Sequence, residues 1–212
     1  MSRTYYFKPV SILVLVSGNG TNLQALLDAE KSGALDGGKI AAVIADRNTA
    51  YALERAKMAG IPVYTEEPDF SLSKTGRRRE LSERILCRCR EKQIDLIVNA
   101  GFLSILAGSI IEEYSGRIIN LHPALLPKFG GQGMYGEHVH RAVLDARESE
   151  SGCTVHLVDA GIDTGVILLQ RKVPVLPGDS PESLAERIQK EEHIAIVEGV
   201  KIMIGRLEEK RE

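Results

Sequence analysis

A short apolar run that leads through a glycine turn into a helical stretch is the feature that most constrains the fold of this chain. Residues 11–16 are Ser-Ile-Leu-Val-Leu-Val, without the polar alternation of a half-exposed strand. Such runs are typical of strands buried on both faces of a parallel sheet. The stretch at 23–29 then places its leucines on one face, as a helix that covers a sheet requires. Further apolar runs follow at residues 40–45, 94–98 and 117–121.

The order of these segments predicts one α/β domain. Helical stretches at 51–59 and 77–92 alternate with the apolar runs, which is the βαβ arrangement of a parallel sheet. Strands at 151–158 and 166–175 are close enough to pair as an antiparallel hairpin, and Ser180 with Pro181 begins a last helix that ends near residue 207. We therefore expect a single domain over residues 1–212. Its fold class is α/β and Rossmann-like, with a mostly parallel central sheet flanked by helices and an antiparallel C-terminal hairpin.

Composition excludes several classes of partner. The chain has 212 residues and a formal net charge of −2 at pH 7, so nothing indicates a surface for nucleic acid. The first apolar run is too short to span a membrane and lacks a signal-cleavage pattern. Three cysteines give neither a metal pattern nor an even disulfide set. We expect a cytoplasmic protein that acts on small molecules as a monomer or homodimer.

A glycine turn follows the first predicted strand. Residues 17–22 are Ser-Gly-Asn-Gly-Thr-Asn, and a helix begins directly after them. Backbone N–H groups at such a helix start can converge on a phosphate, and the helix dipole favours its negative charge. The alternative is a tight connection without a ligand, since neither the full dinucleotide fingerprint nor a P-loop lysine is present.

Three polar residues are placed at predicted strand ends and suit acyl transfer. Asn120 and His122 end one strand before Pro123, and Asp163 lies in the turn between the last two strands. We expect Asp163 to raise the pKa of His122, which then acts as a general acid, and Asn120 to donate an N–H to an oxyanion. The alternative is local hydrogen bonding at turns.

Other interpretations of the polar residues stay open. Asp46, after the second strand, could contact a ribose, which keeps a Rossmann dehydrogenase as a competing hypothesis. The spacing of His138 and His140 is compatible with two ligands of a zinc site. A third and fourth ligand are not suitably spaced, so no metal is expected. We interpret His156 as a packed structural residue.

Two connecting segments border the predicted site. Residues 128–136 are too rich in glycine for regular structure and form a candidate lid. The apolar turn at 99–106 could line a pocket, or Phe102 and Leu106 could pack beneath a short helix that continues through residues 110–114.

The chain resembles the folate-dependent formyltransferases in several motifs taken in order along its length. The Asn-x-His-Pro core with a later Asp-x-Gly is common to that family, and Ser-Gly-Asn-Gly-Thr-Asn-Leu-Gln is typical of its glycinamide ribonucleotide branch. The similar segments are ILVLVSGNGTNLQALLDA, AGFLSIL, INLHPALLPKF, GCTVHLV, IDTGVILLQ and QKEEH.

The resemblance implies formyl transfer from 10-formyltetrahydrofolate to the amine of glycinamide ribonucleotide, with Asn120, His122 and Asp163 as the catalytic residues. It further implies that the ribonucleotide is bound by Gly20, Thr21, Asn22 and Glu192. The implied folate-binding residues are Lys74, Leu103, Ser104, Ile105, Leu106, Asn120, Ala160, Gly161 and Ile162. Ser104 stands where many relatives have arginine, so only backbone contacts are expected there.

Two further functions remain as alternatives. Formyltetrahydrofolate hydrolases share the core but add an N-terminal regulatory domain, and methionyl-tRNA formyltransferases add a C-terminal domain for which this chain has no room. The two alternatives are therefore a formyltetrahydrofolate hydrolase and a Rossmann-type nucleotide-binding protein without formyl transfer.

Overall fold

The computed structural model describes residues 8–210. Within them, one sheet of seven strands has the order β3-β2-β1-β4-β5-β6-β7. The five strands from β3 to β5 run parallel, whereas β6 pairs antiparallel with β5 and with β7. The predicted α/β fold with a C-terminal antiparallel hairpin is confirmed. The strands are β1 (Val10–Val16), β2 (Gly38–Ala45), β3 (Val63–Thr65), β4 (Leu96–Asn99), β5 (Ile118–His122), β6 (Glu150–Leu157) and β7 (Ile167–Pro174).

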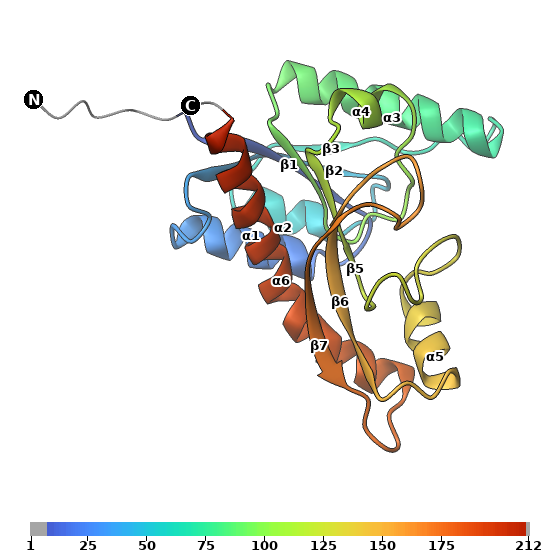
Figure 1. Cartoon of the computed structure of the whole chain (residues 1–212). Helices are drawn as coiled ribbons and strands as arrows, with labels where there is room; N and C mark the ends of the chain where they lie inside the picture. Colours follow the sequence, from blue (N-terminus) through green and yellow to red (C-terminus); the bar gives the residue numbers. More distant parts are fainter. Residues whose placement is uncertain (1–7, 211–212) are drawn as a thin grey trace, which may run out of the picture.

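Helices cover both faces of the sheet (Figure 1). On one face α1, α2 and α6 enclose the larger apolar cluster, which includes Val14, Val98 and Ile119. On the other face α3 and α4 enclose a second cluster with Leu13 and Ile97. This two-sided burial explains why the central strands are continuous apolar runs. The helices are α1 (Thr21–Lys31), α2 (Ala52–Met58), α3 (Lys74–Glu91), α4 (Ser109–Glu113), α5 (Glu137–Asp145) and α6 (Pro181–Glu209).

The strand order reverses direction at β1. The chain goes outward from β1 to β2 and β3, then returns to place β4 on the other side of β1. In open α/β sheets, ligands bind beyond the carboxyl ends of the strands at such a switch point. The glycine turn after β1 and the connection after β4 both begin there.

Two predicted helix boundaries were wrong. Ser73 accepts a hydrogen bond from the Gly76 N–H and caps α3, so this helix begins at Lys74 and not at the expected residue 77. Residues 101–107 contain no helix, and α4 begins only at Ser109. The reason lies in side chains that satisfy the loop's backbone: Leu103 N–H donates to Ser17 Oγ at 2.8 Å, and Ala107 N–H to Ser82 Oγ at 2.9 Å.

Among residues 8–210, no helix is both long enough and apolar enough to cross a membrane.

Candidate active site

A cleft of about 390 Å³ opens at the carboxyl ends of β4 and β5. Four connecting segments and α6 form its walls, so residues far apart in the sequence share one space. The segments that line it include residues 101–106, 120–123, 131–136 and 161–163, together with Ala185, Gln189 and Glu192 of α6.

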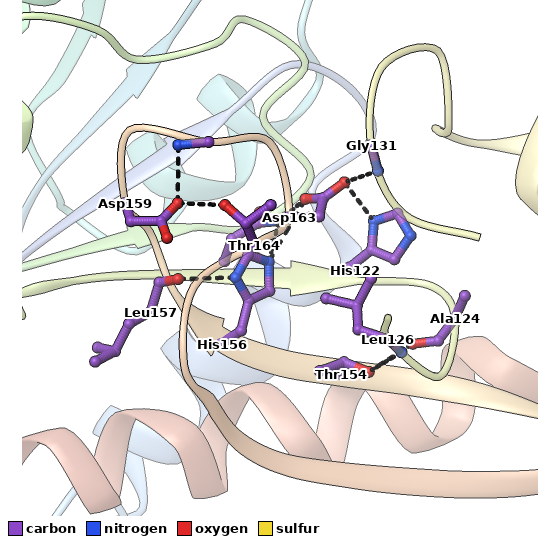
Figure 2. A network of polar contacts seen from close by, with 12 residues as sticks. His122, Ala124, Leu126, Gly131, Thr154, His156, Leu157, Asp159, Asp163 and Thr164 are labelled. Carbon is purple, nitrogen blue, oxygen red and sulfur yellow. Dashed lines mark hydrogen bonds and ion pairs between the residues drawn. The ribbon is translucent and has the colours of Figure 1, made fainter. Parts of the chain in front are cut away.

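The predicted trio comes together in this cleft. Asn120 and His122 lie two residues apart on β5 and therefore point to the same face of the sheet. Asp163 lies between the rings of His122 and His156 (Figure 2). Its Oδ2 is 3.6 Å from His122 Nδ1, and its Oδ1 is 3.5 Å from Asn120 Nδ2, which donates to it.

Asp163 is held rigidly by its own backbone and by neighbouring groups. It has φ of +58°, a left-handed conformation that is uncommon outside glycine. Its Oδ2 accepts the Gly131 N–H at 3.0 Å. Burial alone would raise the pKa of Asp163, but the imidazoles of His156 and His122 and the Gly131 N–H favour the charged form and hold that pKa below 3.8. A fixed carboxylate therefore faces both rings.

Burial lowers the pKa of His122 by more than Asp163, as expected, raises it, so the net shift is downward and not upward. The His122 side chain is only 4% exposed, and burial lowers its pKa below the usual 6.5 despite the opposing influences of Asp163 and the Phe129 carbonyl. The effect of burial on the pKa is larger than these two influences because burial removes the water that would solvate an imidazolium. At neutral pH the ring is therefore uncharged. Its Nε2–H donates to the Phe129 carbonyl at 2.8 Å, which leaves the Nδ1 lone pair facing Asp163.

His156 is part of the site, which the sequence interpretation missed. It is buried, and its Nδ1–H donates to the Leu157 carbonyl at 2.9 Å. Nε2 is then free to accept from Asn120 Nδ2 at 3.1 Å. The predicted strand pairing could have identified it, because His156 lies directly opposite Asn120 once β5 and β6 pair antiparallel. His156 thus fixes the orientation of the Asn120 amide.

The glycine-rich segment 128–136 contacts His122 and Asp163 through its backbone. Phe129 accepts from His122 and Gly131 donates to Asp163. Residues 131–136 line the cleft. A Cβ at Gly130 would lie 2.5 Å from Leu126 Cδ2 and 3.2 Å from Asp163 Cβ, so a larger residue there would require these side chains to shift. The role of the segment as a lid stays a prediction.

The glycine turn brings the start of α1 against α6. Gly20 precedes α1 with φ of +74°, and a Cβ there would lie 2.5 Å from Ala52 Cβ. Asn22 Nδ2 donates to Glu192 Oε2 at 3.2 Å, and Gln189 Nε2 donates to Thr21 Oγ1 at 3.2 Å. Asn22 and Glu192 line the cleft, whereas Gly20 and Thr21 lie beside it.

The surroundings of Glu192 shift the pKa of its carboxyl group. Burial raises the pKa of its carboxyl, and the hydrogen bond from Asn22 opposes that rise only partly. The Oδ1 atom of Asn22 is buried without a partner among the described residues. A buried acceptor atom without a partner and a carboxyl group with a raised pKa therefore lie next to the start of α1.

The residues expected at the folate divide into two groups. Seven of the nine, Asn120 among them, line the cleft, and Ala160 and Lys74 do not. Ser104 also borders a second cavity beside the cleft, where its Oγ donates to Asp46 Oδ2 at 2.8 Å. The seven that line the cleft are Leu103, Ser104, Ile105, Leu106, Asn120, Gly161 and Ile162.

The structure does not favour the two competing hypotheses, a ribose contact by Asp46 and a zinc site at His138 and His140. The side chain of Asp46 is 2% exposed and already pairs with Arg47 at 3.0 Å, so it is not free for a ribose. His138 is exposed, whereas His140 is buried. In the region 8–210, no three His, Cys, Asp or Glu side chains are grouped as a metal site would need.

The cysteines show no nucleophilic activation. Cys87 is exposed, whereas Cys89 and Cys153 are buried. Burial raises the pKa of both buried thiols to about 12.

Comparison with known proteins identifies relatives of this arrangement. A formyl transferase family model matches residues 10–200. A phosphoribosylglycinamide formyltransferase from Escherichia coli is 40% identical over 184 residues, which cover 87% of this chain and 82% of that protein. The trifunctional purine biosynthetic protein adenosine-3 of Drosophila melanogaster is 40% identical over 197 residues, but these cover 92% of this chain and 14% of that much longer protein.

Solved structures agree with the sequence comparison. The crystal structure of glycinamide ribonucleotide transformylase 1 from Symbiobacterium toebii superposes with a TM-score of 0.85 at 38% identity, covering 97% of this chain and 92% of that one. The structure of phosphoribosylglycinamide formyltransferase from Bacillus halodurans gives a TM-score of 0.81 at 33% identity, with 91% and 94% covered. This chain therefore belongs to the formyl transferase family.

Proposed function

We propose that this protein transfers the formyl group of 10-formyltetrahydrofolate to the primary amine of glycinamide ribonucleotide, a step of de novo purine biosynthesis. The observation that carries the proposal is that Asn120, His122 and Asp163 meet in a cleft that also contains Asn22 and Glu192. The names of the relatives on this fold support the choice of substrates.

The ribonucleotide is expected at the start of α1. This helix is eleven residues long, so its first N–H groups and its dipole attract the phosphate. Gly20, Thr21 and Asn22 supply those groups. Glu192, close by on α6, is then placed to accept a hydrogen bond from the glycinamide portion.

The folate is expected between two loops. Residues 103–106 and residues 161–163 both line the cleft. Apolar side chains such as Leu106, which is 6% exposed, suit the flat ring system, and backbone groups of the irregular loop remain for polar contacts. The folate supplies the formyl group on N10.

The chemistry needs one bond made, one broken and one proton moved. The amine nitrogen forms a bond to the formyl carbon, the bond from that carbon to N10 breaks, and the amine proton is transferred to N10. His122 suits the proton transfer because its ring is neutral at rest, with the Nδ1 lone pair facing a carboxylate 3.6 Å away. A proton taken up at Nδ1 is stabilised by Asp163 and returned to the leaving nitrogen.

Asn120 supplies an N–H to the oxygen of the formyl group. Its amide now donates to His156 at 3.1 Å and to Asp163 at 3.5 Å. The second bond is long and therefore weak, so that hydrogen can be redirected to the developing oxyanion while His156 holds the other.

A folate-release assay with and without glycinamide ribonucleotide tests the proposal. We expect release only with the ribonucleotide, and His122→Ala should lower turnover by about two to four powers of ten while ribonucleotide binding persists. Equal release without the ribonucleotide would instead indicate a formyltetrahydrofolate hydrolase. Unchanged turnover in His122→Ala would refute the role given to that ring.

A further inference from the structure

Asn99 is a polar residue at the end of a strand that is otherwise apolar. It follows Leu96, Ile97 and Val98 on β4 and is the last residue of that strand. The register places Asn99 beside Asn120, and Asn120 beside His156. Neighbours in register share a face of the sheet. Asn99 therefore extends the row of polar residues formed by Asn120 and His156.

The fold gives this amide no partner. Asn99 is only 7% exposed, and its Oδ1 is buried without a hydrogen bond. Its Nδ2 donates to no described residue either, and the residue lines the cleft. A buried amide without partners destabilises a protein, and an apolar residue of similar size would not. The Oδ1 atom of Asn99 is therefore available to a group that enters the cleft.

The position of Asn99 indicates which substrate it contacts. Strand alternation puts it on the face of Ile97, which packs toward α3 and α4, and not on the face of Val98, which packs toward α1 and α6. Asn22 and Glu192, assigned to the ribonucleotide, belong to α1 and α6. Asn99 also leads directly into the loop 101–106. It therefore lies on the folate side of the cleft.

We propose that Asn99 is a folate-binding residue, whose amide forms a hydrogen bond with the polar edge of the fused ring of the formyl donor. The inference rests on the proposed function. The edge of a reduced pterin carries adjacent N–H and carbonyl groups, and a carboxamide, which is both donor and acceptor, complements such an edge. Asn99 would select for that edge against ring systems that lack it.

The variant Asn99→Leu separates a binding role from a packing role. We expect Tm to rise by about 3 °C or more, because a buried unpartnered amide is removed. We also expect the Kd of tetrahydrofolate, measured by calorimetry, to increase about 5- to 30-fold, as for loss of one buried hydrogen bond. The KM of the ribonucleotide should stay within about twofold. Asn99→Ala, which cannot overpack the site, should weaken folate binding in the same way.

Ser151→Ala is the matched control. Ser151 Oγ is also buried without a partner, but the residue does not line the cleft. Its removal should leave the Kd of tetrahydrofolate unchanged. A raised Tm in Asn99→Leu with unchanged folate affinity in both Asn99 variants would overturn the inference, as would a selective loss of ribonucleotide binding. Tetrahydrofolate that binds the wild type without any formyl transfer would refute the proposed function but leave the test of Asn99 valid.

Discussion

Replacing Asp163 by asparagine removes the negative charge beside His122 while keeping the size of the side chain. The two groups are 3.6 Å apart, and their side chains are 11% and 4% exposed. At that distance, with an effective dielectric constant of about 20, the attraction between a carboxylate and an imidazolium is about 5 kcal/mol. This attraction exists only while His122 is protonated, that is, during the reaction.

Loss of this attraction raises the barrier by up to that amount, so we expect kcat of Asp163→Asn to fall by about a thousandfold or more. Initial rates of folate release at saturating substrates measure kcat, and calorimetry measures the Kd of each substrate. Asp159→Asn is the control, because Asp159 lies in the same loop and contacts Gly161 and Thr164 rather than His122. Its kcat should change by less than about threefold.

A loss of less than about tenfold in Asp163→Asn would refute the reasoning. So would a loss of the same size in Asp159→Asn, because the effect would then come from a disturbed loop and not from the charge beside the ring.

Three further predictions concern the titration of His122, the pH dependence of stability and the ribonucleotide site. NMR titration of the His122 ring should give a pKa below 6.5, because burial lowers it. The pKa of His122 should be lower still in Asp163→Asn, because the carboxylate that raises it is gone. A higher pKa of His122 in the variant than in the wild type would contradict this account. Because the folded pKa lies below the unfolded one, the stability that the neutral ring confers is present above about pH 6.5 and declines as the pH falls. Asn22→Ala should raise the KM of the ribonucleotide about tenfold with little change for the folate. The exposed Asn19→Ala in the same turn should change neither constant, and equal effects of Asn22→Ala on both substrates would count against the ribonucleotide site.

Much of the fold followed from local patterns. The run at 11–16 became β1, and Ser180 with Pro181 began α6 as expected, because buried parallel strands and capped helices have strong local signals. The loop at 101–107 was harder to predict. Its backbone bonds to Ser17 and Ser82, residues distant in sequence, so no local pattern could separate it from a short helix.

The residues of the site likewise divide into those that the sequence predicts and those that only the structure reveals. Asn120, His122 and Asp163 were found from strand ends and from family resemblance, and the structure brings them together. The pKa of His122 could not be predicted, because its direction depends on how deeply the ring is buried and not on the presence of Asp163 alone. Asn99 was expected only as the first residue of a turn that could line a pocket, because in sequence an asparagine after an apolar run is indistinguishable from turn chemistry. Its missing partners become visible only in three dimensions.

The most direct test of the central claim is to follow an isotopically labelled formyl group. Purified protein is supplied with 10-formyltetrahydrofolate carrying a ¹³C formyl carbon and with glycinamide ribonucleotide, and the products are analysed by mass spectrometry. We predict that the label appears on the amine of the ribonucleotide in equal amount to the tetrahydrofolate released. Label recovered as formate, or a ribonucleotide that stays unlabelled while the folate is consumed, would contradict the account.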